Sequence, residues 1–453
     1  MKRTILEPEH LALRQAAIDF LEKFAVPHRA EWEEQGHVGR EIWRQSAAQG
    51  LLGIEIPEQY GGIGIGDYRF NAMIIEASTR TRSGVALILQ NEIVAPYIVH
   101  LGTEEQRQRW LPGMAAGDVL GAIAMSEPGA GSDLAGIRTS AVRDGSGGTP
   151  ASANLPPSAT GGSAHFPGRF GRVANLPPSA TGGSAHSPGR FGRVANLPPS
   201  ATGGSAHSPG RFGRVAAGGG EWVINGSKTF ISGGFLADFV IVVARTDPEA
   251  GHKGFTLFVV ETDRPGFTRG KKLDKIGQRT SDTMELFFSD VRVPDSNRLG
   301  EEGRGFYALM RNLPRERLGI AIGGLTGAEH AFDLTMAYAR DRHAFGQPIG
   351  TFQVNRHALS EMHTKLQVAR TYLDQCILGV VDKTLSAEDA AGAKWWITEL
   401  EWEIVDRCMQ MFGGYGYINE YEIAQIWKDA RIQRLYGGTT EILKDLNGRK
   451  LGF

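Results

Sequence analysis

The sequence predicts an α+β protein of several domains: an N-terminal α-helical domain, a middle antiparallel β domain and a C-terminal four-helix bundle. Three successive patterns along the chain predict this class. Apolar residues recur at helical spacing over residues 1–117, short β-rich runs bounded by Gly, Asp and Pro follow over 118–293, and long helical periodicity returns over 294–453. A chain of 453 residues also exceeds one ordinary hydrophobic core, so it should divide into domains.

The N-terminal domain is expected to be helical because its apolar residues repeat with a helical period. Leu11, Ile18, Leu21 and Phe24 follow that spacing. Further along, residues 103–106 read Thr-Glu-Glu-Gln, which is typical of a capped helix start. The sequence therefore predicts that a new helix begins there.

The middle and C-terminal domains differ in the length of their apolar segments. Short runs rich in β-branched and aromatic residues predict strands at 239–243, 255–260 and 284–288. Longer periodic segments predict helices at 304–340, 352–381, 387–412 and 439–449. Gly and Pro punctuate these helices at 346–348 and 413–414, where breaks are expected.

A tandem repeat interrupts the β domain. Residues 153–173, 174–194 and 195–215 are three copies of one 21-residue unit rich in Pro and Gly and free of acidic residues. Such a unit cannot bury enough apolar surface to offset the entropy of ordering it, which predicts a low-complexity, flexible insertion. The flanking segments 137–143 and 221–225 read as short strands, so the repeats should extend the turn of a hairpin.

Composition excludes several classes of protein. The formal net charge is −1, which gives no indication of nucleic-acid or anionic-membrane binding. No run of about 18 apolar residues is present to span a membrane, and the N-terminus turns acidic too soon for a signal peptide. Cys376 and Cys408 lie in apolar helical stretches without metal-type spacing, so we expect buried free thiols and no metal site. These features predict a soluble, cytoplasmic protein.

Three Gly-rich segments stand in a defined order along the chain. They are 126–133 (SEPGAGSD), 230–234 (FISGG) and 436–441 (YGGTTE). One such run alone is weak evidence, because most are ordinary turns. Together with their flanking residues, the three resemble the flavin-binding segments of the acyl-CoA dehydrogenase family. The resemblance covers the chain apart from the repeats, and its three-part helical, β and helical order matches the fold predicted above.

The resemblance implies FAD as the cofactor. No Gly-x-Gly-x-x-Gly motif follows a strand, so a nicotinamide cofactor is not expected. In the family, Ser126 and Ser232 match positions that hydrogen-bond the flavin, and Phe230 matches an aromatic packing position. Ser132 lies in the same first segment and is expected to contact both cofactor and substrate. Taken alone, Phe230 would favour a buried aromatic beside a turn.

Two further segments match positions around the distal half of the cofactor. Arg342, Phe345 and Gln353 would contact FAD held mainly by a neighbouring subunit, as the family's RxxFG…Q segment does. Gln410 and Gly414 match a QxxGG segment that supports the pyrophosphate and adenosine. Arg suits phosphate because its planar fork donates two hydrogen bonds, and Gly permits close backbone approach. A helix C-cap is an equally good explanation of the glycine pair there.

The catalytic base is expected on a helix. Many relatives place a Glu directly after the Tyr of a YEGT motif, whereas here Gly437 follows that Tyr. Another subgroup, which includes the long-chain and isovaleryl types, supplies the base from the first helix of the bundle in an LxxER sequence. Residues 313–317 (LPRER) match it, which makes Glu316 the candidate base and Arg317 its electrostatic neighbour at the substrate. An isolated helical Glu would otherwise suggest a surface ion pair.

The expected chemistry follows from the resemblance. Glu316 takes an α-proton while a hydride leaves Cβ for the flavin. The backbone N–H of Gly437 and a ribityl hydroxyl polarise the thioester carbonyl, as in an oxyanion hole. Thr439 and Glu441 complete the segment and should lie beside the cofactor.

The function expected is FAD-dependent dehydrogenation of an acyl-CoA thioester to the trans-2-enoyl-CoA, with a medium- or long-chain fatty acyl group. The long-chain type is the nearest subgroup, and relatives are usually homotetramers that pass electrons to electron-transferring flavoprotein. Alternatives are a branched-chain or sterol-side-chain dehydrogenase, an oxidase of the same fold, and a non-catalytic assembly factor. Acyl-chain length depends on pocket side chains from several helices, which the sequence does not resolve.

Overall fold

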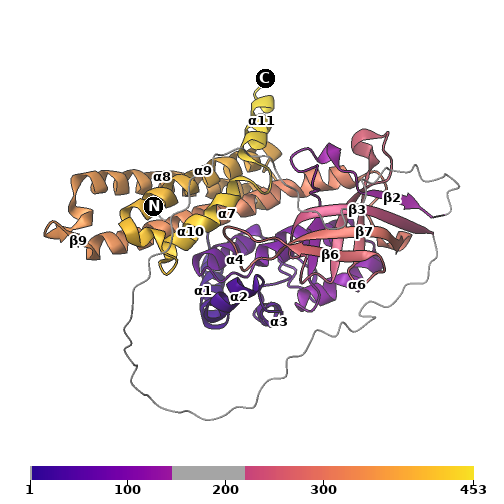
Figure 1. The fold of residues 1–453 in the computed structure, drawn as a ribbon, viewed down its shortest axis with the longest axis horizontal. Helices are drawn as coiled ribbons and strands as arrows, with labels where there is room; N and C mark the ends of the chain where they lie inside the picture. Colours follow the sequence, from indigo (N-terminus) through magenta and orange to yellow (C-terminus); the bar gives the residue numbers. More distant parts are fainter. Residues whose placement is uncertain (1–2, 145–219) are drawn as a thin grey trace, which may run out of the picture. The chain divides into compact units, whose positions relative to one another are not determined.

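A computed structural model describes residues 3–144 and 220–453 of the chain. The three repeats at 153–215 lie outside the described residues. Within the described residues, N-terminal helices are followed by a β-sheet and then by the longest helices (Figure 1). This order confirms the predicted fold class.

Short helices form the N-terminal part. Their bounds are α1 (Pro8–Phe24), α2 (Arg29–Gln35), α3 (Glu41–Ala48), α4 (Tyr68–Arg80), α5 (Ala95–Leu101) and α6 (Glu104–Ala115), with a π-helical turn at Leu89–Val94. The expected start of α6 is confirmed: the Thr103 Oγ1 accepts from the Gln106 N–H at 3.3 Å, and the Gln106 side chain accepts from the Thr103 N–H at 2.9 Å. In α1, Leu21 is buried but Leu11 and Phe24 are exposed, because other residues face the core: His10, Ala17 and Phe20.

One mixed sheet forms the middle part. Its strands are β1 (Gly121–Ala124), β2 (Ser140–Arg143), β3 (Glu221–Ser232), β4 (Phe239–Arg245), β5 (Phe255–Glu261), β6 (Phe267–Lys272), β7 (Thr283–Pro294) and β8 (Arg298–Leu299). The order is β6-β7-β3-β2-β4-β5-β8, with β1 beside β4. Most neighbours are antiparallel, including the predicted hairpin of β2 and β3, whereas β4 pairs in parallel with both β1 and β2.

Long helices form the C-terminal part, and their bounds match the expected ones closely. They are α7 (Gly305–Asp341), α8 (Gln353–Val381), α9 (Ala387–Met411), α10 (Glu422–Ala430) and α11 (Thr440–Lys450). A small hairpin of β9 (His343–Ala344) and β10 (Gln347–Pro348) fills the break between α7 and α8. Helix α10 was not predicted, since it is short and lies between two loop segments.

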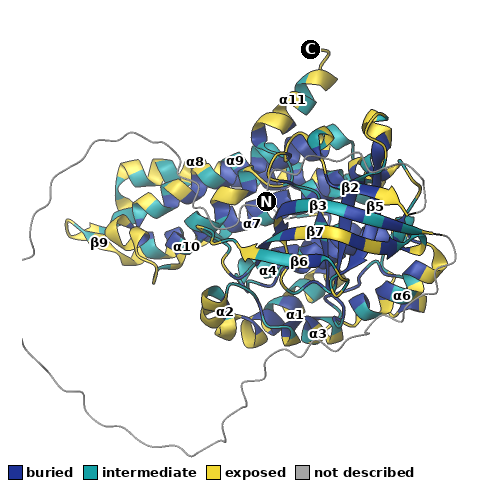
Figure 2. Ribbon diagram, turned by 45° about the vertical axis from the view of Figure 1, so that its right-hand side comes forward, coloured by how far each residue is buried: buried dark blue, intermediate teal, exposed yellow. Residues whose placement is uncertain are grey.

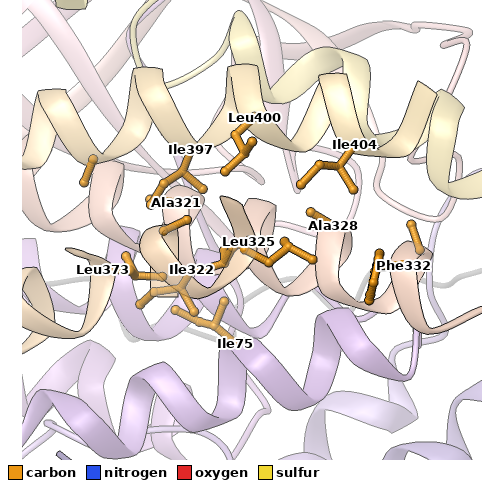
Figure 3. Close-up of a cluster of buried hydrophobic side chains, with 14 of the residues drawn as sticks. Ile75, Ala321, Ile322, Leu325, Ala328, Phe332, Leu373, Ile397, Leu400 and Ile404 are labelled. Atoms are coloured by element: carbon orange, nitrogen blue, oxygen red, sulfur yellow. The ribbon is translucent and has the colours of Figure 1, made fainter. Parts of the chain in front are cut away.

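The core of the helical part surrounds α7. Figure 3 shows Ile322 and Leu325 of α7 between Ile75 of α4 and Leu400 of α9. These side chains are almost completely buried, and small residues on α7 let α9 approach closely. Because α7 is held on several sides, the side chains that it presents have fixed positions.

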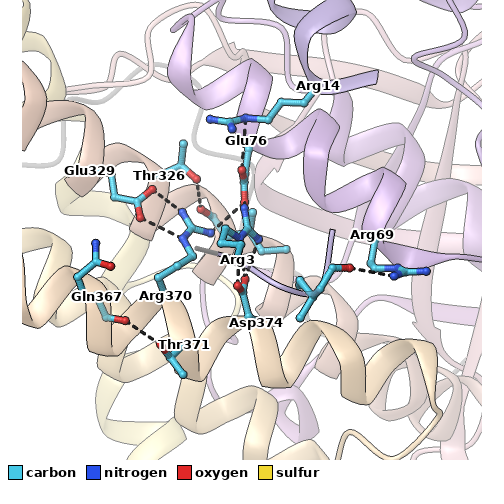
Figure 4. Close-up of polar contacts among 12 residues, drawn as sticks. Arg3, Arg14, Arg69, Glu76, Thr326, Glu329, Gln367, Arg370, Thr371 and Asp374 are labelled. Atoms are coloured by element: carbon cyan, nitrogen blue, oxygen red, sulfur yellow. Dashed lines mark hydrogen bonds and ion pairs between the residues drawn. The ribbon is translucent and has the colours of Figure 1, made fainter. Parts of the chain in front are cut away.

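A buried ionic network joins the N-terminal arm to α4 and α8 (Figure 4). Arg3 donates to Glu76 at 2.7 Å and to Asp374 at 2.7 Å, and Arg370 donates to the same Glu76 oxygen at 2.9 Å. Arg370 also pairs with Glu329 of α7. A carboxylate as buried as Glu76 requires such partners, because an unpaired charge there would be strongly destabilising.

Burial differs between the elements (Figure 2). Strands β4 and β5 are buried almost along their whole length, whereas α8 and α11 expose one side. Cys376 and Cys408 are buried free thiols, as expected. Among the described helices, none combines the length and apolarity that crossing a membrane requires.

Candidate active site

Glu316 is buried in the first third of α7. Its Oε1 accepts hydrogen bonds from the Tyr97 hydroxyl at 3.1 Å and from Asn312 Nδ2 at 2.8 Å. Burial raises the pKa of the Glu316 carboxyl to about 7, although both hydrogen bonds and the charge of Arg317 favour the ionised form. A carboxyl with this pKa can gain and lose a proton near neutral pH, as a general base must.

The next residue, Arg317, connects Glu316 to the C-terminal Gly-rich segment. Its Nε donates to the carbonyl of Gly437 at 3.2 Å. Gly437 and Gly438 both have left-handed backbone, with φ of 67° and 101°. A Cβ on Gly437 would lie 2.4 Å from Ile320 Cδ1, so glycine suits this position for conformation and for space. The structure therefore brings together the predicted base and the predicted carbonyl-polarising segment.

A cluster of charges fixes the residue on the other side of Glu316. Arg315 Nε donates to the fully buried Glu92 at 2.6 Å, and its Nη1 donates to Glu55 at 2.6 Å. Burial raises the pKa of Glu92, while Arg315 opposes that shift. Because Glu92 lies in the π-helical turn before α5, Arg315 ties α7 to the turn that leads to Tyr97.

The first two Gly-rich segments lie side by side. The Thr229 N–H donates to the carbonyl of Ser126 at 2.9 Å. Lys228, which is fully buried, pairs with Glu127 at 2.9 Å and also donates to the Met125 carbonyl at 3.1 Å. Burial lowers the pKa of the Lys228 ammonium to about 8, and the Glu127 charge opposes that shift. This ion pair holds the start of segment 126–133 against the end of β3.

These two segments present an aromatic ring and three hydroxyls. Phe230 has φ of 59° and an exposed fraction of 69%, so its ring is not a core side chain. Ser132 and Ser232 are exposed and Ser126 is partly buried. Within the described residues, none of these three hydroxyls has a hydrogen-bond partner. The arrangement leaves an apolar face and polar groups available to a bound molecule.

The distal set gathers at another place. Arg342 and the ring of Tyr415 are 5.6 Å apart, which joins the turn after α7 to the turn after α9. Phe345 is 96% exposed, and Gln353 and Gln410 are exposed as well. Figures 1 and 2 place β9 at the end of α7 and α8 away from the sheet that carries Phe230.

The last segment forms a helix start. Thr439 is the N-cap of α11, and its Oγ1 accepts from the Ile442 N–H at 3.4 Å. Glu441 is exposed in the first turn, where a negative charge is favoured.

Gly413 and Gly414 follow α9, and a Cβ at either would meet no atom within 4 Å. Backbone at these positions is open to close approach.

Sequence reasoning missed several residues of the site. Tyr97 and Lys394 reach the site from helices distant in sequence, and Lys394 Nζ donates to the Gly438 carbonyl at 2.7 Å. No local pattern predicts either contact. Asn312 precedes Glu316 by four residues, so the helical i, i+4 rule could have found it.

A cavity of about 790 Å³ lies between the end of α5, the start of α6, β8 and the first turns of α7. Its lining includes His100, Arg304 and Arg311 but none of the predicted site residues. Glu316 does not line this cavity, and its carboxyl combines burial, a raised pKa and a neighbouring polar segment. Within the described residues, no group of three His, Cys, Asp or Glu side chains is arranged to hold a metal.

Comparison with known families matches all three parts of the chain. The acyl-CoA dehydrogenase N-terminal, middle and C-terminal domains match residues 7–118, 201–291 and 303–452. The chain belongs to the acyl-CoA dehydrogenase family. This enzyme is therefore an oxidoreductase of an FAD-dependent family.

The similarity to individual proteins extends over almost the whole chain. The mitochondrial long-chain specific acyl-CoA dehydrogenase of Sus scrofa is 38% identical, covering 99% of this chain and 88% of its own. The mitochondrial isovaleryl-CoA dehydrogenase of Pongo abelii is 30% identical over 98% of this chain and 89% of its own. The crystal structure of an acyl-CoA dehydrogenase from Geobacillus kaustophilus is 37% identical, with a TM-score of 0.82 and full coverage of both chains.

The residues present fit FAD. An exposed aromatic ring with free hydroxyls beside it suits the face and polar edge of a flavin, and the open glycines after α9 suit close approach of a pyrophosphate. Arg342, at the distal site, has the planar donor set that phosphate requires. The individual contacts of Ser126, Phe230, Ser232 and the distal residues with FAD stay predictions.

Proposed function

We propose that this enzyme dehydrogenates a saturated acyl-CoA thioester between Cα and Cβ to the trans-2-enoyl-CoA, with Glu316 as the base. The observation that carries the proposal is the environment of Glu316: buried, with a pKa raised to about 7, and adjacent in sequence to the arginine that holds Gly437. The predicted base and the predicted carbonyl-polarising segment thus belong to one connected site.

The two oxygens of Glu316 have different roles in this proposal. Tyr97 and Asn312 both donate to Oε1, while Oε2 accepts no hydrogen bond within the described residues. Oε2 is therefore the atom that receives the α-proton. Substrate binding excludes water and strengthens the interaction of the carboxylate with its neighbours.

Other residues of the chain polarise and hold the substrate. The N–H of Gly437 donates to the thioester oxygen, which stabilises negative charge as the α-proton leaves. Arg317 keeps that segment in place through the Gly437 carbonyl. Bound FAD supplies the acceptor for the hydride from Cβ. The predicted cofactor residues would hold it near the ring (Ser126, Ser132, Phe230, Ser232, Thr439 and Glu441) and at the distal half (Gln410 and Gly414). Arg342, Phe345 and Gln353 would contact the FAD held mainly by a neighbouring subunit.

Substrate class, acceptor and assembly complete the proposal. A medium- or long-chain fatty acyl group is supported by the identity with the long-chain relative, and a branched acyl group by that with the isovaleryl relative. A homotetramer is the proposed assembly. Figures 1 and 2 place β9, which lies next to Arg342 and Phe345, away from the sheet that carries Phe230, and this placement supports use of the distal set by a neighbouring subunit's FAD. An electron-transferring flavoprotein is the proposed acceptor, and the cytoplasmic location expected from the sequence stays a prediction.

Anaerobic flavin bleaching tests the proposal. Wild type, Glu316→Gln and the surface control Glu403→Gln are each mixed with butanoyl-, isovaleryl-, dodecanoyl- and hexadecanoyl-CoA. We expect rapid bleaching by wild type and the control, and a rate at least about 10²-fold lower for Glu316→Gln, since general bases typically contribute 10²–10⁴. The best substrate defines the acyl class.

Equal bleaching by wild type and Glu316→Gln would remove Glu316 as the base. Purified wild type that binds FAD but bleaches with none of these substrates would contradict the proposed reaction. Purified protein without a flavin spectrum would favour the non-catalytic assembly factor.

A further inference from the structure

Besides Arg317, a buried lysine contacts the Gly437–Thr439 segment. Lys394 of α9 has no exposed side-chain surface, and its Nζ donates to the Gly438 carbonyl at 2.7 Å. Lys228, the other fully buried lysine of the described residues, has Glu127 as its carboxylate partner. Lys394 forms no salt bridge in the described part of the chain. A buried charge held mainly by a carbonyl calls for a reason beyond packing.

The energetics of this placement are unfavourable on their own. Burial lowers the pKa of the Lys394 ammonium to about 8, and repulsion from Arg317 adds to that shift, while Glu399 and Glu441 oppose it. Removing an ammonium from water is unfavourable unless partners compensate. A methionine would fill the same space without that penalty, so stability does not explain a lysine here.

The segment that Lys394 contacts cannot hold itself in place. Gly437 and Gly438 have no side chains, and both have left-handed φ values. Glycine has the largest conformational freedom in the unfolded and flexible chain, so its geometry depends on external contacts. Two successive carbonyls provide those contacts: Arg317 binds that of Gly437 and Lys394 binds that of Gly438.

Resting on the proposed function, we propose that Lys394 is a positioning residue that fixes the Gly438 carbonyl and thereby aims the Gly437 N–H at the substrate thioester. It does not contact the substrate. The two carbonyls lie in the two peptide planes that follow Gly437. Anchoring both to cations restricts the backbone on the C-terminal side of Gly437, and the N–H of Gly437 is held through its own φ and ψ. A displacement of about 1 Å at such a donor can lower a rate by about 10²-fold.

The test uses the full-length enzyme with bound FAD. Wild type, Lys394→Met and Lys394→Gln are compared with Lys365→Met, an exposed lysine paired with Glu403 on the bundle surface. Flavin reduction by dodecanoyl-CoA gives kcat and KM. The carbonyl stretch of bound trans-2-dodecenoyl-CoA, labelled with ¹³C at the thioester carbon, reports how strongly that carbonyl is polarised.

For Lys394→Met we expect kcat to fall about 10- to 100-fold, below the ~10²–10³ typical of losing a whole oxyanion donor, with KM within about threefold. The carbonyl stretch should shift towards that of the free thioester. Lys394→Gln, a neutral donor, should lie between wild type and Lys394→Met, and Lys365→Met should match wild type.

The inference fails if Lys394→Met keeps kcat within twofold of wild type, or if kcat falls while the carbonyl stretch stays unchanged. The second result would identify a merely structural lysine. If Lys394→Met does not retain FAD, the same criteria apply to Lys394→Gln. Wild type that is not reduced by any acyl-CoA contradicts the proposed function instead, and that result appears before any variant is compared.

Discussion

Replacing Glu316 with glutamine should stabilise the protein above neutral pH. The pKa of Glu316 is about 7 in the folded protein, against an ordinary value of 4.5. Since one pKa unit corresponds to ~1.4 kcal/mol, keeping this carboxyl ionised in the fold costs about 3 kcal/mol. Glutamine avoids that cost, and its Oε1 can still accept from Tyr97 and Asn312.

The sign follows from the direction of the shift. Because the folded pKa is raised, the folded state holds the proton more tightly than the unfolded state. The corresponding stability is complete below about pH 4.5, declines as pH rises, and is lost above about pH 7. Glu316→Gln should therefore resemble wild type near pH 5 and exceed it by up to about 3 kcal/mol at pH 8.

Thermal unfolding of FAD-saturated wild type and variant, measured from pH 5 to pH 8, checks this expectation. The difference in Tm should grow by a few degrees across that range. Glu403→Gln, which alters an exposed ion pair between α8 and α9, should show a constant difference. A gap between Glu316→Gln and wild type that is the same at every pH would refute the raised pKa.

Three further predictions concern activity and packing. The kcat/KM for acyl-CoA should rise with pH through about 7, because only ionised Glu316 accepts a proton. At pH 6 it should be about tenfold lower than at the high-pH plateau, and a flat profile over pH 6–8 would contradict this. Arg315→Met leaves the buried Glu92 unpaired and should cost about 3–5 kcal/mol in calorimetry, whereas loss of the exposed Arg407–Glu361 pair should cost under about 1 kcal/mol. Gly437→Ala should lower kcat about tenfold relative to the control Gly448→Ala, because the added Cβ of Gly448→Ala meets no atom within 4 Å. Equal values of kcat would show that the left-handed backbone at Gly437 is not required.

Local patterns predicted the long elements well. The periodicity that predicted a helix over 304–340 corresponds to α7 at Gly305–Asp341, because the apolar face and the Gly-Pro break are both encoded locally. Strand β1 was not predicted as a strand: it has four residues, and it exists because it pairs with β4, more than a hundred residues later. Pairing of this kind depends on tertiary contacts that no short window contains.

The site divides in the same way. Residue identity and order indicated Glu316 and Gly437, and the structure joins them through Arg317. The groups that set the chemistry of Glu316 were not found, since Tyr97 lies 219 residues earlier in the chain. Burial of that carboxyl likewise results from packing of α7 and cannot be deduced from its neighbours in sequence.

The position of the base is connected to the shape of the Gly437 segment. A side chain at 437 would have to adopt a φ near 67°, and its Cβ would meet Ile320 Cδ1 at 2.4 Å. Ile320 is itself almost fully buried, so it has little room to move. A side chain at 437, where many relatives carry their base, would therefore need a left-handed backbone and a shift of the Ile320 side chain on the helix that here carries Glu316. Ile320 lies one turn after Glu316 on α7. The helix that supplies the Glu316 carboxylate therefore also occupies the space that a side chain at 437 would need. Steric exclusion by this helix face thus favours the combination of Glu316 with Gly437.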